Sequence, residues 1–408
     1  MTTHDLIGAD VFDFDRVIQR EETDSVKFDA RKAVFGTDQV IPLWVADMDF
    51  AAPQAVSLAL EARARHPVYG YSLFPESLYQ SLIEWFAARH GWRIERDWIM
   101  MAPGVVPSLH AAAMAFAKEG DGIIIQPPVY PPFFSSVQKT GRRVIENPLR
   151  WQDGEYRMDL EHLDACAAQG AKMLILCSPH NPVGRIWREE ELQALLEITR
   201  KHNLLVLSDD IHCDLVFAGH RQQMLASLAT PAERIITAVA PSKTFNIPGM
   251  GLSALVIPDP AHRQAMKRVF ETLHMEQANP FSIVAFETAY RQGGAWLDAL
   301  LPYLEGNRQT VMEFLRQHVP QIRCAPTQGT YLLWLDCRTL GMSDTQLKAF
   351  FIQKAGVGLN PGISFGAAGS GFMRLNIGTR RQVLKQALEQ IRDAVQSHCA
   401  TALSRQSR

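Results

Sequence analysis

The sequence predicts an α/β protein whose larger part is a mostly parallel, seven-stranded type of sheet flanked by helices. From about residue 100 to 260, short continuous apolar runs alternate with amphipathic stretches. Continuous apolar runs are typical of strands that are buried on both faces, as they are in parallel sheets. A chain of 408 residues is also too long for one ordinary core, so we expect two domains.

The predicted strands are residues 122–126, 173–177, 204–208, 235–240 and 252–257. Between them, residues 189–202 favour a helix, because Leu192, Leu195 and Leu196 recur at helical spacing after an acidic first turn. In a sheet of this kind, ligands bind at the carboxyl ends of the strands.

The two ends of the chain differ from this central part. Residues 1–49 are polar and irregular, and from about residue 297 the pattern changes to helices and alternating strands such as 330–335. We therefore predict a large domain of residues 50–296 and a smaller α+β domain built from residues 1–49 and 297–408.

The composition argues against several classes of partner. The net charge is −2, from 41 basic and 43 acidic residues, which gives no electrostatic case for nucleic acid or for an anionic membrane. No apolar run approaches the roughly 18 residues of a membrane span. The N-terminus lacks a signal pattern, and the six cysteines form no C-x-x-C pair. We expect reduced, non-catalytic cysteines and a cytoplasmic protein.

Three polar residues follow successive strands of the predicted sheet. Asn181 follows 173–177, Asp209 follows 204–208, and Lys243 follows 235–240. A lysine can form a Schiff base with an aldehyde, and a carboxylate can keep a pyridine nitrogen protonated. The trio therefore predicts a pyridoxal 5′-phosphate site with Lys243 as the catalytic residue. Taken singly, the three have ordinary alternatives: a turn, a helix cap and an exposed strand end.

These motifs, in this order, resemble those of the fold-type I pyridoxal phosphate enzymes, the aspartate aminotransferase superfamily, over nearly the whole chain. The resemblance implies that Asn181 hydrogen-bonds the phenolic oxygen of the cofactor and that Asp209 pairs with its pyridine nitrogen. It also places His212 near the cofactor oxygen. Tyr130 either stacks on the pyridine ring or simply packs in its proline-rich loop. We expect no metal site, because the sequence has no H-E-x-x-H or comparable ligand pattern.

A glycine turn at Gly104 leads through Val105 and Val106 into a helical stretch at 108–118. Backbone N–H groups at the start of a helix attract anions, although an ordinary helix entry has the same pattern. The resemblance implies that Val105 and Val106 cradle the cofactor phosphate and that Ser242 adds a hydroxyl.

Two positions depart from the superfamily pattern. Ala240 stands where many relatives carry Ser or Thr, so one phosphate contact is missing. Gly251 stands where aminotransferases commonly have arginine, which argues against the typical aspartate aminotransferase branch.

Arg374 alternates with apolar residues in the predicted strand at 371–378. Its planar guanidinium suits a substrate carboxylate, and a structural salt bridge is the alternative. Tyr71 resembles the tyrosine that reaches the cofactor phosphate of the neighbouring subunit, which implies a homodimer with shared active sites. The resemblance also places Asn181 and Tyr71, with Arg374, at the substrate.

The residues alone leave the reaction open, because Lys243 could take an α-proton in transamination or in β-elimination. Segments 44–50, 70–72, 208–212 and 242–249 resemble those of bacterial C–S lyases, the aminotransferase-type cystathionine β-lyases. This implies β-elimination from cystathionine or another cysteine S-conjugate, which yields a thiol, pyruvate and ammonia. Trp44 either lines the side-chain pocket or packs.

Two alternatives to a lyase stay open. One is a class I/II aminotransferase. The other is a cofactor-binding regulator with little turnover, although the residues before Met100 show no basic helix-turn-helix pattern.

Overall fold

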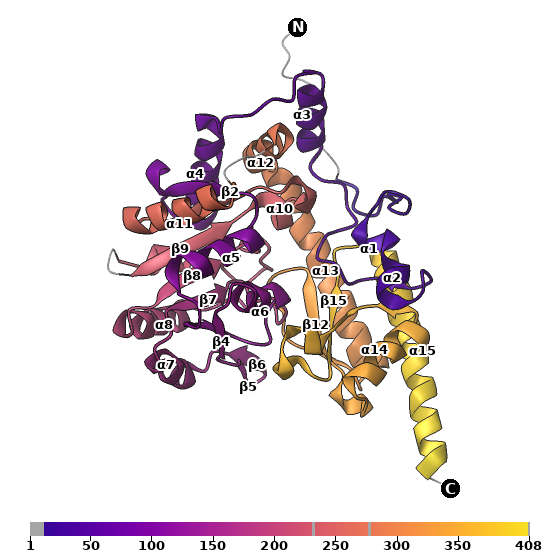
Figure 1. Ribbon diagram of the computed structural model, residues 1–408. Coiled ribbons are helices and arrows are strands. Elements are labelled where there is room, and N and C mark those ends of the chain that lie inside the picture. Colours follow the sequence, from indigo (N-terminus) through magenta and orange to yellow (C-terminus); the bar gives the residue numbers. More distant parts are fainter. Residues whose placement is uncertain (1–11, 231–232, 276–278, 407–408) are drawn as a thin grey trace.

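A seven-stranded sheet forms the centre of the computed structural model, which describes residues 12–230, 233–275 and 279–406 (Figure 1). Its strands, in spatial order, are β2 (Ile99–Ala102), β10 (Ser253–Val256), β9 (Arg234–Val239), β8 (Leu205–Asp209), β7 (Met173–Cys177), β3 (Gly122–Ile125) and β4 (Arg143–Glu146). Only β10 runs antiparallel to its neighbours. The predicted α/β class and the mostly parallel sheet are confirmed.

Helices cover both faces of this sheet, which explains why its strands are apolar throughout. Ile123 and Ile125 pack into one core with α5 (Val105–Phe116), α6 (Pro131–Gln138) and α11 (Pro260–Thr272). Ile124 points into another core, with α7 (Leu160–Ala168) and α8 (Glu189–Lys201). The short elements on this side are α9 (Leu225–Leu228), β5 (Arg150–Gln152) and β6 (Glu155–Arg157).

The elements predicted from sequence differ from the observed ones mainly at their ends. The helix expected at 189–202 is α8, and the stretch at 108–118 is α5, which begins three residues earlier. Lys243 does not end a strand: it lies on a single helical turn, α10 (Pro241–Thr244). Pro241 starts this turn, and a proline's fixed φ favours the first position of a helix.

A second, antiparallel sheet lies toward the C-terminus, on the right of Figure 1. Its order is β11 (Arg323–Cys324), β12 (Leu332–Asp336), β15 (Phe372–Asn376) and β14 (Asn360–Pro361). The accompanying helices are α13 (Gly294–His318), α14 (Asp344–Gln353) and α15 (Arg381–Gln406).

The N-terminal segment joins this C-terminal part. It contains α1 (Val26–Asp29), α2 (Arg31–Phe35) and β1 (Ile41–Pro42), and β1 pairs in parallel with β13 (Val357–Gly358). Elements from the N-terminal and the C-terminal parts of the chain thus lie side by side, next to the large sheet (Figure 1). The exact domain limits at 49/50 and 296/297 stay a prediction.

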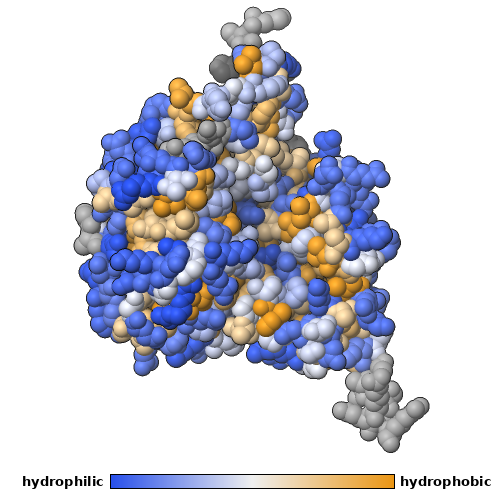
Figure 2. Space-filling model, in the orientation of Figure 1, coloured by the Kyte–Doolittle hydropathy of each residue, from blue (hydrophilic) through white to orange (hydrophobic). Residues whose placement is uncertain are grey.

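The remaining helices are α3 (Gln54–Ala64), α4 (Glu76–His90) and α12 (Pro280–Gln292), which pack on one another at the upper end of the molecule. Hydrophobic side chains interrupt the hydrophilic surface around α3 in Figure 2. Val68, Tyr69, Tyr71 and Leu73, in the segment after α3, are all largely exposed. Among the described helices, none combines the length and apolar character needed to cross a membrane.

Candidate active site

A cavity opens at the carboxyl ends of β7, β8 and β9, where Ala46 of the N-terminal segment meets the sheet. Its walls include eight of the predicted site residues: Val105, Val106, Tyr130, Asn181, Asp209, His212, Ser242 and Lys243. Residues that lie between positions 105 and 243 of the sequence therefore meet at one edge of the sheet, as parallel topology requires.

Lys243 presents its amine to this cavity from α10. The Nζ atom donates a hydrogen bond to the carbonyl oxygen of Ala46, at 2.6 Å. Burial, together with the nearby Arg374 guanidinium, lowers the pKa of Lys243 to about 8, against the opposing pull of Asp47 and Asp209. The neutral amine, which is the nucleophilic and basic form, is therefore accessible near neutral pH.

Asp209 is the last residue of β8 and is 5% exposed. Burial raises the pKa of its carboxyl to about 7, although the Ile211 N–H (3.2 Å) and the Lys243 ammonium favour the charged form. No described cation forms an ion pair with Asp209. A buried carboxylate without a paired cation fits the protonated nitrogen of a pyridine ring.

Aromatic and amide groups lie between these two residues. The Tyr130 N–H donates to the carbonyl oxygen of Asn181 (3.1 Å), which fixes the Tyr130 loop against the strand end. His212 is buried, and burial lowers its pKa well below the usual value, so the ring is neutral. Its Nδ1 has no partner among the described residues. The ring packs edge-on against Tyr331, with centroids 5.9 Å apart.

The opposite end of the cavity suits a phosphate group. Val105 and Val106 begin α5, and no side chain caps this helix. The first backbone N–H groups of a helix have no partner within it, so they are available to an anion. Ser242 adds a hydroxyl to the wall, whereas Ala240 adds none.

Arg374 lies on β15 beside the cavity, 4% exposed. Its Nη1 donates to Asn181 Oδ1 (3.1 Å), and its Nη2 donates to Asn360 Oδ1 (2.7 Å) and to the Trp44 carbonyl (2.9 Å). The Nε has no partner, and no described carboxylate lies within ion-pair distance. A salt bridge therefore does not explain this buried cation, and a carboxylate ligand would.

Residues 44–47, which we call the strap, close the site through their backbone. The sequence singled out segment 44–50 for its resemblance to C–S lyases but did not predict this backbone role. Backbone carbonyls of the strap accept hydrogen bonds from Tyr331 Oη (to Ala46, 2.8 Å) and from Asn376 Nδ2 (to Val45, 2.6 Å, and Asp47, 2.7 Å). Partners that lie some 285 and more positions away along the chain leave no local sequence signal.

Trp44 packs rather than lining the cavity. Its indole N–H donates to the Lys27 carbonyl at 3.1 Å, and its ring meets Phe35 edge-on at 5.5 Å. Of the two roles that the sequence left open for Trp44, packing is the one that these contacts match.

Tyr71 does not line the cavity in a single chain. It lies in the irregular segment between α3 and α4, and its side chain is 96% exposed. Its assignment to cofactor and substrate therefore depends on a second subunit.

The fold and this site define an α/β enzyme of the pyridoxal phosphate type. The family described as Aminotransferase class I and II matches residues 38–391, and the chain belongs to that family. The resemblance predicted from the motifs is confirmed.

Individual relatives narrow the comparison. The chain is 40% identical to cystathionine beta-lyase PatB of Bacillus subtilis (strain 168) over 384 residues. This alignment covers 94% of this chain and 99% of that protein. Cystalysin from Treponema denticola, whose crystal structure contains pyridoxal 5′-phosphate, superposes with a TM-score of 0.92 at 35% identity, over 95% of this chain and 99% of that one. The pyridoxal-phosphate-bound C–S lyase of Staphylococcus hominis superposes with a TM-score of 0.89 at 30% identity, over 95% of this chain and 99% of that one.

Proposed function

We propose that this chain is a pyridoxal 5′-phosphate-dependent C–S β-lyase. It cleaves the Cβ–S bond of cystathionine or another cysteine S-conjugate and yields a thiol, pyruvate and ammonia. The observation that carries the proposal is a cavity lined by Lys243 and Asp209, with Arg374 beside it and bonded to Asn181 of its wall, in a chain that aligns with a cystathionine β-lyase over almost its full length.

The residues in the cavity fit the cofactor group by group. The start of α5 and Ser242 would hold the phosphate, and Asp209 would pair with the pyridine nitrogen; all of them line the cavity. Asn181 would donate to the phenolic oxygen, and Tyr130 would pack against the ring. When bound, the cofactor withdraws electrons from the substrate's α-carbon.

Arg374 and Lys243 divide the work on the substrate. Arg374 grips the α-carboxylate through its planar fork, a charge-assisted contact. Lys243, whose pKa lies near 8, accepts the α-proton. The Cβ–S bond then breaks with its electron pair on sulfur, and the thiolate takes up a proton. Water hydrolyses the remaining three-carbon unit to pyruvate and ammonia.

Transamination uses the same groups, so the product assay must separate the two reactions. Gly251 supports the lyase: it lines the cavity where aminotransferases commonly place arginine, with a left-handed φ of +57°. With cystathionine and no keto acid, the holoenzyme should release pyruvate and homocysteine in equal amounts. A requirement for a keto-acid acceptor without thiol release would favour the aminotransferase, and bound cofactor without turnover would favour the regulator.

We also propose a homodimer whose subunits share their active sites. The segment after α3 exposes Tyr71 (96%) and Leu73 (91%), large side chains that a second subunit would cover. The test mixes two weakly active variants, Lys243→Ala and Tyr71→Ala. Hybrid dimers carry both substitutions in one site and none in the other, so about a quarter of the wild-type sites return. Without recovery in verified hybrids, Tyr71 would act within its own chain.

A cytoplasmic location is part of the same proposal. All six cysteines are free thiols, and free thiols persist in reducing compartments. Fractionation of the native host, with the enzyme traced by thiol release, tests it.

A further inference from the structure

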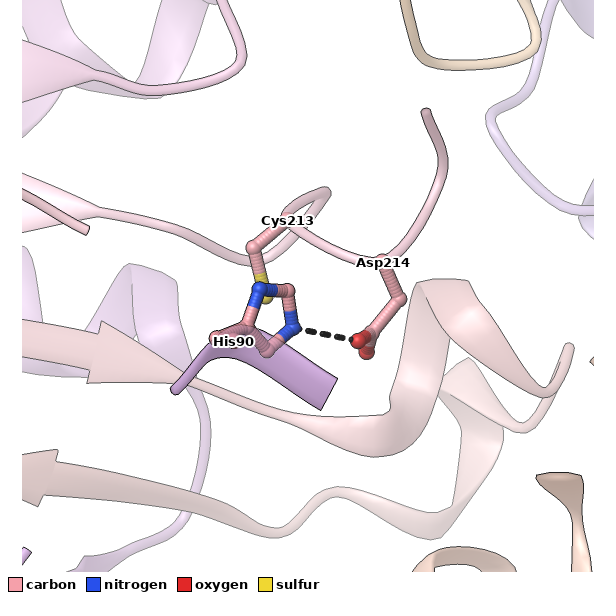
Figure 3. Close-up of side chains that lie close together, drawn as sticks. All are labelled: His90, Cys213 and Asp214. Carbon is pink, nitrogen blue, oxygen red and sulfur yellow. Dashed lines mark hydrogen bonds and ion pairs between the residues drawn. The ribbon is translucent and has the colours of Figure 1, made fainter. Parts of the chain in front are cut away.

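A cluster of side chains of the types that bind metal ions lies outside the candidate active site. It is found where the C-terminal end of α4 meets the loop after β8 (Figure 3). One ligand atom each of His90, Cys213 and Asp214 lie within 4.8 Å of one another. His90 Nε2 and Asp214 Oδ1 are 2.7 Å apart, the contact dashed in Figure 3. The sequence predicted no metal site, because His90 is far along the chain from the other two residues.

We propose that His90, Cys213 and Asp214 form a Zn²⁺ site. Imidazole nitrogen, thiolate sulfur and carboxylate oxygen are the ligands zinc takes in proteins, and sites with three protein ligands keep a fourth position for water. Zinc–ligand bonds of about 2.0–2.3 Å place tetrahedral ligands about 3–4 Å apart, so small side-chain shifts suffice. The metal replaces the thiol proton of Cys213, which leaves to solvent.

An unsatisfied hydroxyl beside the cluster supports this assignment independently. Tyr290 is 4% exposed, and its hydroxyl has no hydrogen-bond partner among the described residues. The Tyr290 ring packs against Trp85, with centroids 5.6 Å apart, and the Trp85 indole N–H donates to Asp214, so Tyr290 lies next to the cluster. An unpaired buried donor is costly, and a hydroxide on the zinc ion, formed when the bound water loses a proton, would supply its acceptor.

The cluster is reachable from outside. His90, Cys213 and Asp214 form part of the wall of a cavity whose rim includes the exposed Asp298 and the half-buried Glu305. An ion can therefore enter without unfolding the loop after β8.

The site touches the segment that carries the catalytic lysine. Asp214 Oδ2 accepts a hydrogen bond from Thr244 Oγ1 (2.8 Å), and Oδ1 accepts one from the Trp85 indole (3.0 Å). Thr244 directly follows Lys243 in α10. A bound ion that fixes Asp214 therefore also fixes the turn that presents Lys243.

The test measures metal retained by the holoenzyme. After incubation with Zn²⁺ and dialysis against metal-free buffer, mass spectrometry of the metal should find about one zinc ion per chain. Retention should fall by more than about tenfold in Cys213→Ser and in His90→Gln. Co²⁺ in place of zinc should give a thiolate-to-cobalt absorption band that Cys213→Ser loses.

Cys166→Ser is the matched control. Cys166 is also buried, and its sulfur lies 3.7 Å from His162 Nε2, but the described residues place no third ligand with that pair. This variant should retain zinc. Cofactor content is measured in every sample, because zinc held by the cofactor would persist in all variants alike. Failure of the wild type to retain zinc, or retention that survives both Cys213→Ser and His90→Gln, would overturn the proposal; if Cys213→Ser does not fold, His90→Gln decides.

Discussion

The cofactor side and the substrate side of the candidate active site are built in different ways. On the cofactor side, Asn181, Asp209 and Lys243 lie at or shortly after the ends of three adjacent strands of one sheet, so the sheet brings them together. On the substrate side, Arg374 of β15 is held by Asn181 and by the carbonyl of Trp44, which lie 193 and 330 positions away along the chain.

The two sides also contribute different chemical groups to the reaction. The cofactor side contains the two groups with perturbed pKa values near neutrality, Lys243 and Asp209. The substrate side contains a permanent cation and backbone carbonyls of the strap. We therefore expect substitutions on the cofactor side to abolish chemistry and those on the substrate side to weaken binding.

The largest effect is expected from Lys243→Ala. Lys243→Ala removes the amine that we propose takes the α-proton, so kcat should fall by more than about a thousandfold. Borohydride should no longer attach the cofactor to the protein. Lys201→Ala removes an exposed lysine that pairs with Asp164 and serves as the control. A Lys243→Ala protein that still gave a borohydride-trapped cofactor would show that another lysine holds it.

The second largest effect is expected from Asp209→Ala. The variant should retain part of its cofactor but lose about a hundredfold or more in kcat, because the pyridine nitrogen loses the charge that keeps it protonated. Asp210→Asn is the matched control: Asp210 is equally buried but lies outside the cavity, and burial raises its pKa to about 8, so an amide resembles its protonated form. Equal kcat in Asp209→Ala and wild type would remove Asp209 from the mechanism.

The same contrast explains what the sequence could predict. Strands β3, β7 and β8 are visible as apolar runs, and polar residues at their ends stand out locally, so the cofactor side was found. The strap was noticed only as a lyase-like segment, and its contacts were not predicted, because Ala46 acts through its carbonyl and Tyr331 looks like any residue of an alternating strand. The antiparallel direction of β10 and the pairing of His90 with Asp214 likewise depend on contacts between distant segments.

Arg374→Ala tests the substrate side. A charge-assisted hydrogen bond contributes about 1.5–3 kcal/mol, so kcat/KM should fall about 10- to 100-fold while cofactor content stays unchanged. Arg374→Lys keeps the charge without the planar fork and should recover only part of the loss. If kcat/KM were unaltered for all amino-acid substrates, Arg374 would be a structural residue.

The smallest effect concerns the rate at which cofactor-free protein takes up pyridoxal phosphate. Cofactor uptake needs Lys243 as the neutral amine and Asp209 as the carboxylate. The pKa is about 8 for Lys243 and about 7 for Asp209. Both reactive forms increase with pH. The uptake rate should therefore rise between about pH 6.5 and pH 9 and level off above about pH 9.

Two variants should move this profile in opposite directions, one from each side of the site. The Arg374 guanidinium lowers the pKa of Lys243, so Arg374→Ala should shift the plateau to higher pH. The Asp209 carboxylate raises that pKa, so Asp209→Ala should shift the plateau to lower pH. Stopped-flow absorbance of cofactor binding across this pH range measures both shifts. Profiles that did not move, or that moved together, would mean that the two sides do not act on Lys243 through their charges.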